Sequence, residues 1–330
     1  MARYAAIAGW GKYLPQRVLT NQDLERMVDT SDEWIRTRTG IVERRLVDDG
    51  EAASTMAVRA ARQALERADL PAFALDLIIV ATSTPDYLFP ATACLVQDAL
   101  GAIHAGAFDL EAACSGFLYA LTVGTQFVRS GMYENVLVVA SEALSRITNW
   151  EDRNTCVLFG DGAGAAVLRP TSQRRGLLAS TLGAYGAGSD LLIMPAGGSA
   201  RPASLETVAG RQHYIHMKGN EVFRFAVRSM GQATQEVLKQ AGLGVEDISL
   251  FVPHQANLRI IEALAERLGL PMERIFVNLH RYGNMSAATI PVALCEAAEE
   301  GRLKEGDIVV TTAFGAGLTW AAGVIVWGGI

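Results

Sequence analysis

Two stretches of the chain, AVRAARQALERADL from Ala57 and AVRSMGQATQEVLKQAGL from Ala226, match each other at an offset of 169 residues. Each is followed by a short acidic turn and an apolar run, DLIIVAT at residues 76–82 in one case and DISLFVP at residues 247–253 in the other. A pattern that returns in this way, a helical segment and then a strand-like one, indicates a structural unit that is present twice.

The remaining blocks of the two copies follow in the same order. They are QDALG (97–101) with AERLG (265–269), AFDLEAAC (107–114) with IFVNLHRYGN (275–284), and SGMYENVLVVASEA (130–143) with EGRLKEGDIVVTTA (300–313). The offsets stay between 168 and 172 residues, which chance similarity between apolar runs would not maintain. We therefore expect two homologous halves, residues 1–174 and residues 175–330.

Within each half, short apolar runs alternate with helical segments. Strands of a parallel sheet are buried on both faces and appear in sequence as nearly continuous apolar runs. The segment 258–268 has the complementary pattern of an amphipathic helix, with Leu258, Ile261 and Leu264 on one face and charged residues on the other. The predicted fold class is α/β. In such folds reactive groups collect where strands end and helices begin.

Composition excludes several classes of protein. Half of the 330 residues are apolar and only 19% are charged, which is typical of a packed globular chain and not of a disordered one. Lys and Arg number 29 against 35 Asp and Glu, a formal net charge of −6. Nucleic-acid binding that depends on the phosphate backbone needs a basic field, so we expect no nucleic-acid partner.

The four cysteines, Cys94, Cys114, Cys156 and Cys295, lie far apart and form no CxxC pair. This spacing fits neither a zinc site nor a disulfide-rich secreted domain, and it favours a cytoplasmic location. The apolar stretch at the N-terminus is too short for a signal sequence, and this segment is predicted to be a strand. Residues 308–330 carry no charge and have the length of a membrane span, but their glycines divide them into two strand-like runs around a turn, so we expect no membrane partner.

Cys114 is the best candidate for a nucleophile. It follows the strand-like AFDL (107–110) and begins an apolar helical segment, ACSGFLYALTVGTQFV. Unpaired backbone N–H groups at a helix N-terminus favour a thiolate, so we expect a lowered pKa for this thiol. The alternative is a buried cysteine that only packs, and we expect that packing role for the other three cysteines.

A cysteine nucleophile needs polar partners, and the second half of the chain offers two. His254 ends the strand-like ISLFVP, just before a helix for which Asn257 is a suitable N-cap. Asn284 lies in the loop RYGNMSAAT, after a predicted strand IFVNL (275–279), and the repeat places it near the position of Cys114. We expect all three side chains to meet near one pseudo-twofold axis. The alternative for each residue alone is a structural histidine or a loop-capping asparagine.

Two other patterns are weaker. The segment RQHYIHMK alternates like a strand, which would place His213 and His216 on opposite faces, so we expect no shared metal. Gly162 and Gly164 resemble part of a dinucleotide fingerprint, but a short apolar run and a proline follow them instead of a helix. A strand, a turn and a second strand are the better prediction there.

Five motifs occur along the chain in an order that is shared with one known family: TSDEWIRTRTGI (30–41), ACSGF (113–117), VPHQANLRII (252–261), YGNMSAAT (282–289) and FGAGLTW (314–320). On these motifs the chain resembles the β-ketoacyl-acyl carrier protein synthase III family of the thiolase superfamily. The resemblance implies the thiolase fold, a duplicated α/β unit arranged as a five-layered αβαβα sandwich, and usually a homodimer. It also implies that no metal or redox cofactor is needed.

The resemblance further implies a two-step condensation that starts fatty acid synthesis. Cys114 would accept the acyl group of an acyl-CoA, with the backbone N–H groups of Cys114 and Ala316 holding the oxyanion. Malonyl-acyl carrier protein would then lose CO₂ to an enolate held by His254 and Asn284. Trp34, Arg38, Thr39 and Arg153 would bind the nucleotide end of coenzyme A, and Asn220 and Asn257 would line its pantetheine tunnel.

Two surfaces follow from the same resemblance. Arg224 and Arg259, with Lys218 and Arg228 beside them, would face the acidic carrier protein, although each arginine alone fits a solvated surface charge equally well. Phe89 matches a position that reaches the acyl pocket of the partner subunit. The sequence departs from the family where Ala316 replaces a common glycine, and TPDYLFP (84–90) matches no single acyl preference.

Four alternatives stay open on the sequence. One is a family member that loads starter units for a polyketide. A thiolase is disfavoured because the turn at 314–317 lacks a second cysteine. A papain-like hydrolase, which also uses Cys, His and Asn, is disfavoured by the duplication. A catalytically inactive partner subunit is disfavoured because all three candidate residues are present.

Overall fold

The computed structural model describes residues 3–329, so Met1, Ala2 and Ile330 at the ends of the two expected halves lie outside the described residues. The strands of the first half are β1 (Tyr4–Tyr13), β4 (Leu77–Ala81), β5 (Gly106–Leu110), β6 (Val136–Ala143) and β7 (Asp161–Thr171). Those of the second half are β8 (Gly176–Gly183), β11 (Leu250–Pro253), β12 (Ile308–Gly315) and β13 (Thr319–Val326). They pair in the order β11-β12-β13-β8-β1-β7-β6-β4-β5.

The two halves of this strand order repeat each other. They meet at a single parallel pair, Ala5 with Gly176, so β1 and β8 are the equivalent inner strands. From there outward, β7, β6 and β4 of the first half correspond to β13, β12 and β11 of the second. In each half the two inner neighbours pair antiparallel and the outer ones parallel. The internal repeat seen in the sequence is therefore a repeat of topology.

The counterpart of β5 in the second half is not a strand, so the expectation of a strand at residues 275–279 is wrong. Only Ile275 pairs, in an isolated parallel bridge with Phe251. Next to it, the buried amide of Gln255 donates to the carbonyl of Phe276 at 3.0 Å and accepts from the N–H of Asn278 at 3.0 Å. A side chain thus satisfies backbone groups that a neighbouring strand would otherwise take.

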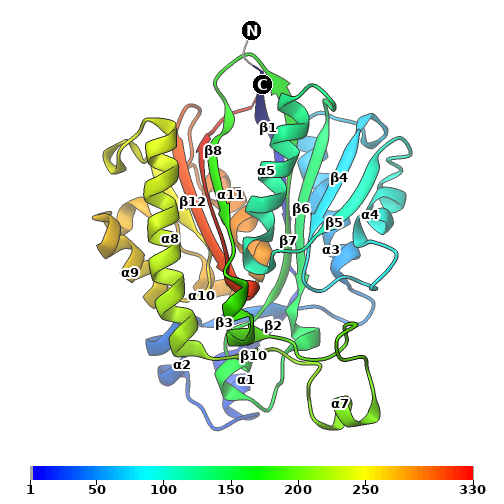
Figure 1. Cartoon of the computed structure of the whole chain (residues 1–330), viewed down its shortest axis with the longest axis vertical. Helices are drawn as coiled ribbons and strands as arrows, with labels where there is room; N and C mark the ends of the chain where they lie inside the picture. Colours follow the sequence, from blue (N-terminus) through cyan, green and yellow to red (C-terminus); the bar gives the residue numbers. More distant parts are fainter. Residues whose placement is uncertain (1–2, 330) are drawn as a thin grey trace.

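Helices form three layers with the strands between them (Figure 1). The six long helices of the two repeats are α3 (Ala53–Arg67), α4 (Thr92–Leu100), α5 (Gly116–Arg129), α8 (Gly219–Ala241), α9 (Leu258–Leu268) and α11 (Thr289–Glu299). The shorter helix α2 (Asp32–Thr39) lies beside α9. Helices α5 and α11 lie in the middle, in one core with the inner faces of β1, β6, β12 and β13. Helices α3 and α4 cover the outer face of one set of strands, and α8 and α9 cover the other. This is the five-layered αβαβα arrangement of the thiolase fold.

The apolar composition of α5 has its cause in this central position. Phe117, Leu118 and Leu121 are each at most 1% exposed. Glycines of β7 allow similarly close packing between this strand and the other central helix, α11. A Cβ at Gly164 would lie 2.7 Å from the Cβ of Pro291 in α11. The Gly162 and Gly164 pair therefore belongs to a buried strand that turns into β8, as the sequence predicted, and not to a nucleotide-binding loop.

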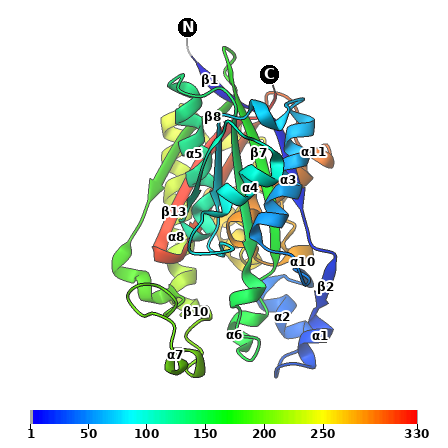
Figure 2. The ribbon, with the colours of Figure 1, turned by 90° about the vertical axis from the view of Figure 1, so that its right-hand side faces the viewer.

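Shorter elements gather at one end of the molecule (Figure 2). They are β2 (Arg17–Thr20), α1 (Asn21–Glu25), β3 (Glu43–Leu46), α6 (Arg153–Cys156), β9 (Leu192–Ile193), α7 (Leu205–Ala209), β10 (His216–Met217) and α10 (Leu279–Tyr282). Fully buried Arg44 on β3 holds β2 and α1 in place. It donates to the carbonyls of Leu19 and Val157 and to the side chain of Asn21. The predicted strand over RQHYIHMK is reduced to two residues of β10, because His213 instead bonds the hydroxyl of Thr207 at 2.9 Å.

The uncharged C-terminal segment forms two buried antiparallel strands, β12 and β13, joined by the 3₁₀ turn η8 (Ala316–Leu318). Across residues 3–329 the structure contains no helix with the length and apolarity of a membrane span. The interpretation of this segment as two strands around a glycine turn is confirmed.

Candidate active site

Cys114, His254 and Asn284 line one cavity of about 430 Å³. Cys114 lies in the 3₁₀ turn η2 (Ala113–Ser115), between β5 and α5. His254 directly follows β11, and Asn284 lies between α10 and the 3₁₀ turn η7 (Ser286–Ala288). The structure therefore brings together the three side chains that the sequence singled out, from strand ends and turns of both halves.

The turns that carry the site are equivalent in the two halves. Ala113 and Ser286 have the same positive φ of 47°, a conformation that non-glycine residues rarely adopt. The N–H of Ala113 donates to Oε1 of Glu111 at 2.9 Å, and the N–H of Ser286 donates to Oδ1 of Asn284 at 2.8 Å. The counterpart of Asn284 is thus Glu111, three residues before Cys114. The sequence analysis placed Asn284 near the position of Cys114, which is three residues away from its true counterpart.

The Cys114 thiol does not have the lowered pKa that its place before a helix led us to expect. Burial raises the pKa of this thiol to about 12, and the negative charges of Glu142 and Glu111 act in the same direction. The Ser286 hydroxyl and the Cys114 backbone N–H lower it only in part. Desolvation of the charged form outweighs the helix N-terminus here, so the resting nucleophile is a thiol.

His254 is a neutral imidazole. It is only 2% exposed, and burial lowers its pKa to about 3. Its Nδ1 lies 2.6 Å from the hydroxyl oxygen of Thr289, the first residue of α11. With Nδ1 engaged, Nε2 is the nitrogen left for a ligand. A neutral histidine disfavours the papain-like alternative, which depends on a thiolate paired with an imidazolium.

Asn284 presents its amide in one orientation. Its Oδ1 accepts the N–H of Ser286, so Nδ2 is the end left to donate to a ligand. Its backbone is fixed on both sides, because its N–H donates to the carbonyl of Leu158 at 2.8 Å and its carbonyl accepts the N–H of Gly160 at 3.0 Å.

The turn at residues 315–317 lies directly against the nucleophile. A Cβ at Gly315 would be 2.6 Å from the backbone N of Cys114 and 3.0 Å from the Cβ of Ala113. Only glycine fits this contact, which places Ala316 beside Cys114. The hydroxyl of Thr319 closes the same corner by donating to the carbonyl of Ala112 at 2.9 Å.

At its outer end the cavity is lined by Trp34, Arg38, Thr39, Asn220, Asn257 and Arg259. The guanidinium carbons of Arg38 and Arg153 lie 5.2 and 5.1 Å from the centroid of the Trp34 ring, so Arg153 reaches this end without lining the cavity. Asn257 caps α9 through the N–H of Arg259 and donates to the carbonyl of Arg38 at 3.1 Å. The predicted N-cap is confirmed, and its amide is engaged on both sides.

The basic residues expected to face a carrier protein lie on α8 and α9. Arg224, Arg228 and Arg259 are exposed, and none of them makes an ion pair within the described part of the chain. Lys218 differs, because its ammonium group is paired with Asp190 at 2.7 Å. Three of the four cations are therefore free to meet an acidic surface.

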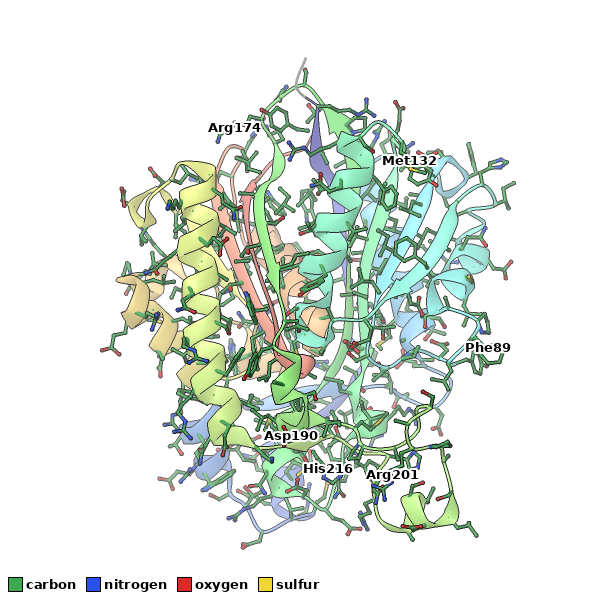
Figure 3. All side chains as sticks on the ribbon, viewed as in Figure 1. Phe89, Met132, Arg174, Asp190, Arg201 and His216 are labelled. Atoms are coloured by element: carbon green, nitrogen blue, oxygen red, sulfur yellow. The ribbon has the colours of Figure 1, made fainter. Side chains whose placement is uncertain are left out.

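Phe89 is not part of the cavity of its own chain. Its side chain is 86% exposed and projects from the edge of the molecule next to Tyr87 and Leu88, which are 60% and 84% exposed (Figure 3). Cys94, which follows on α4, is also exposed, so the expectation that it packs in the core is wrong. Cys156 and Cys295 are buried as expected.

Three polar residues behind the site escaped the sequence analysis. Ser286 and Thr289 belong to the motif YGNMSAAT. The only sequence signal for their place at the site was that these two hydroxyl residues flank small residues within this motif. Glu142 is a fully buried carboxyl group on β6. Its sole sign in the sequence is an acid inside an apolar run, LVVASEAL. Among residues 3–329 no group of three His, Cys, Asp or Glu side chains is arranged to hold a metal ion.

Comparison with known proteins agrees with this geometry. Residues 108–186 match the family model of 3-oxoacyl-[acyl-carrier-protein] synthase III, and residues 238–327 match the model of its C-terminal part. The β-ketoacyl-[acyl-carrier-protein] synthase III of Roseiflexus sp. (strain RS-1) is 57% identical over 99% of both chains. The crystal structure of 3-oxoacyl-[acyl-carrier-protein] synthase III from Aquifex aeolicus VF5 superposes with a TM-score of 0.91, at 51% identity, over 98% of this chain and 100% of that one.

A third relative has a different pathway in its name. It is the crystal structure of a priming β-ketosynthase from a polyketide biosynthetic pathway, 37% identical, with a TM-score of 0.93 and coverage of 99% of this chain and 97% of that one. The family models together span more than half of the chain, and the Roseiflexus relative matches nearly all of it. By sequence and by fold, the chain belongs to the 3-oxoacyl-[acyl-carrier-protein] synthase III family.

Proposed function

We propose that Cys114, His254 and Asn284 carry out the two half-reactions of a condensing enzyme that initiates fatty acid synthesis. As a member of its family the chain is an acyltransferase of this kind. In the first half-reaction the sulfur of Cys114 attacks the thioester carbonyl of an acyl-CoA, and the backbone N–H groups of Cys114 and Ala316 hold the oxyanion. The contact between Gly315 and Cys114 supports this, because it sets the two backbone segments side by side.

In the second half-reaction malonyl-acyl carrier protein loses CO₂ and leaves an enolate. This step needs hydrogen-bond donors at the thioester oxygen and no base. The neutral imidazole of His254 supplies Nε2–H, and Asn284 supplies Nδ2–H, each oriented by a buried partner. The carbanion then attacks the Cys114 thioester, which gives the β-ketoacyl product and the free thiol.

The outer end of the cavity suits coenzyme A. Trp34, flanked by Arg38 and Arg153, offers an aromatic face and two cations for the nucleotide and its phosphates. Thr39, Asn220 and Asn257 lie farther along the same wall. Arg259, which lines the cavity, and Arg224, which is exposed on α8, would meet the acidic carrier protein.

We also propose the larger organisation that the resemblance implies. The chain consists of two homologous halves, 1–174 and 175–330, and two copies form a homodimer in which Phe89 contacts the acyl pocket of its partner. The exposed apolar run Tyr87, Leu88 and Phe89 supports such a contact. Catalysis uses no metal or redox cofactor, and four free thiols support a cytoplasmic location.

The single observation that carries the proposal is the pair of oriented donors, on His254 and Asn284, in one cavity with Cys114. The test is to incubate the enzyme with a panel of acyl-CoAs and malonyl-acyl carrier protein. We expect one acyl group on the protein, release of CO₂, and a carrier-bound chain that is two carbons longer. Acyl transfer to the carrier protein without release of CO₂ would refute condensation.

A second candidate is priming of a polyketide, which the 37% identical ketosynthase favours. The chemistry at Cys114 would be the same, and only the acyl group and the carrier protein would differ. Competition between carrier proteins of the two pathways in the same assay distinguishes the candidates, because the true partner gives the larger kcat/KM.

A further inference from the structure

Glu142 is a buried carboxyl group directly behind the nucleophile. It lies on β6 with no solvent exposure. Its Oε2 accepts the N–H of Ser83 at 3.0 Å and the hydroxyl of Thr84 at 3.1 Å. Its Oε1 is buried too and makes no hydrogen bond of standard geometry within residues 3–329. A carboxylate oxygen without a partner in the core is costly, and such a group needs an explanation.

Ser286 connects this carboxyl group to Cys114. The turn η7, which carries Ser286, packs against both β6 and η2, the turn of Cys114, and the Ser286 hydroxyl lowers the pKa of the Cys114 thiol and of the Glu142 carboxyl group. Its backbone is held at a φ of 47° by the bond from its N–H to Asn284. Strain of this kind persists only where the surroundings enforce it, and it often marks a functional position. Here it fixes the backbone of Ser286 in the turn that packs against both β6 and η2.

Acylation requires that the thiol lose its proton, and the residues already described do not take it. Burial keeps Cys114 protonated, and it also makes His254, with a pKa of about 3, a very weak base. Burial raises the pKa of Glu142 to about 7, which makes its carboxylate a far better acceptor. We propose that Glu142, acting through the hydroxyl of Ser286, accepts the thiol proton of Cys114 when the acyl group is transferred.

The step balances. As the Cys114 sulfur forms its bond to the thioester carbonyl carbon, its proton passes to the Ser286 oxygen, and the Ser286 proton passes to the carboxylate of Glu142. When the tetrahedral intermediate collapses, the bond to the sulfur of coenzyme A breaks. The proton then returns from Glu142 through Ser286 to that leaving thiolate. Nothing is oxidised or reduced, and both relay residues, Glu142 and Ser286, end as they began.

The other titratable groups around Glu142 do not take its place. Glu111 binds the hydroxyl of Ser83 at 3.0 Å and the N–H of Ala113. Asp86 is held by Ser54, and Asp161 by Ser145 and Val47. No lysine or arginine of the described chain forms an ion pair with Glu142. The relay therefore works when Glu142 is ionised, above about pH 7, and stops when it is protonated.

The test rests on the proposed function and measures the rate of acylation from about pH 5.5 to about pH 9.5 by quenched-flow intact mass. For the wild type we expect a rise that levels off above about pH 7. In Glu142→Gln and Ser286→Ala the rate at about pH 8 should fall roughly 100-fold and should keep rising with pH, because only direct ionisation of the thiol remains. Thr84→Val removes a donor to the carboxylate and should move the rise to higher pH.

Ser141→Ala is the matched control, because Ser141 is the neighbour of Glu142 on β6 and bonds only the carbonyl of Ala53. Its profile should be that of the wild type. Unchanged profiles in Glu142→Gln and Ser286→Ala, or equal slowing in Ser141→Ala, would overturn the relay.

Alkylation of Cys114 by iodoacetamide, followed by peptide mapping, separates this proposal from the proposed function, since it needs no acyl-CoA. It should show the same loss of the rise near pH 7 in the two relay variants. Exposed Cys94 serves as the internal control and should react equally in all proteins. A wild type that is alkylated with this profile but takes no acyl group would refute the function and keep the relay.

Discussion

Thr289 is the hydrogen-bond partner of His254 that can select which imidazole nitrogen carries the proton. Its hydroxyl oxygen lies 2.6 Å from Nδ1 of His254 and 3.0 Å from the carbonyl of Ser286. The hydroxyl has one proton, which can go to that carbonyl or to Nδ1, and the enolate-binding form that we propose has it on the hydrogen bond to Nδ1. With Nδ1 as an acceptor, Nε2 holds the only imidazole proton and can donate to the enolate oxygen.

Replacing Thr289 with valine should therefore impair decarboxylation and spare acylation. Without the hydroxyl donor the two tautomers compete, and we expect the release of CO₂ to slow by about 10- to 100-fold. Single-turnover CO₂ release from pre-acylated enzyme measures this, with acyl loading as the parallel readout. Thr289→Ser keeps the donor and should restore the rate. Equal rates in the valine and serine variants would show that Thr289 does not set the tautomer.

Glu142 should also make stability depend on pH. Its pKa is raised from 4.5 to about 7 in the folded chain, so the folded state binds the proton more tightly than the unfolded state. Its contribution is fully present below about pH 4.5 and is lost as the pH rises through about 7, a difference of about 3 kcal/mol.

Chemical unfolding of the wild type and Glu142→Gln at several pH values checks this. The wild type should lose stability relative to the variant as the pH rises from about 5 to about 8. Taking the difference between the two proteins cancels the opposite contribution of His254, whose lowered pKa costs stability as the pH falls. A difference that does not change with pH would contradict a buried, raised pKa at Glu142.

At the scale of elements, the turn after β12 and the turn before α5 depend on each other. Gly315→Ala would place a Cβ 2.6 Å from the backbone N of Cys114, which the fixed backbone cannot absorb without shifting. We expect a loss of about 1 to 3 kcal/mol in stability and at least 10-fold slower acylation. Thermal unfolding and intact mass measure the two effects. Gly186→Ala, at a glycine with open space around it, is the control. Normal acylation in Gly315→Ala would argue against the oxyanion site at this contact.

Most elements of the fold could be predicted from the sequence because periodicity and repetition reflect burial directly. The repeat from Ala57 to Ala226 predicted α3 and α8, and the apolar runs predicted β4, β11, β12 and β13. The failure at residues 275–279 has a local cause: the apolar pattern IFV is that of a strand, but Gln255 takes the hydrogen bonds. Competition between a side chain and a strand partner is invisible until both are placed in space.

The candidate site divides in the same way. Cys114 and His254 were predictable because they follow strand ends, and Asn284 because the repeat places its loop near the position of Cys114. The pKa of Cys114 was not, since the sequence shows the helix N-terminus but not the depth of burial that outweighs it. Glu142 and Ser286 come from different halves, and only the packing of β6 against η7 brings them together.

At the scale of the whole molecule, the exposed apolar run at residues 87–89 should hold the homodimer together. We expect the wild type to sediment with twice the chain mass of 35.3 kDa and Phe89→Arg to sediment as a monomer, because a charge would be buried at the interface. Leu205→Arg changes an equally exposed leucine on α7 and should leave the mass unchanged. A wild type that sediments as a monomer, or a Phe89→Arg variant that stays dimeric, would rule out this contact.

In the proposed function the two halves of the molecule contribute different chemistry to one cavity: the first would supply the nucleophile and the second would supply the donors for the enolate. The most direct test combines intact mass with CO₂ release, on the wild type, Cys114→Ser and His254→Ala, given acyl-CoA and then malonyl-acyl carrier protein. We predict that the wild type is acylated and releases CO₂, that Cys114→Ser takes no acyl group, and that His254→Ala is acylated but releases CO₂ at least 100-fold more slowly. Acylation of Cys114→Ser, or equal loss of both half-reactions in His254→Ala, would contradict this division of labour.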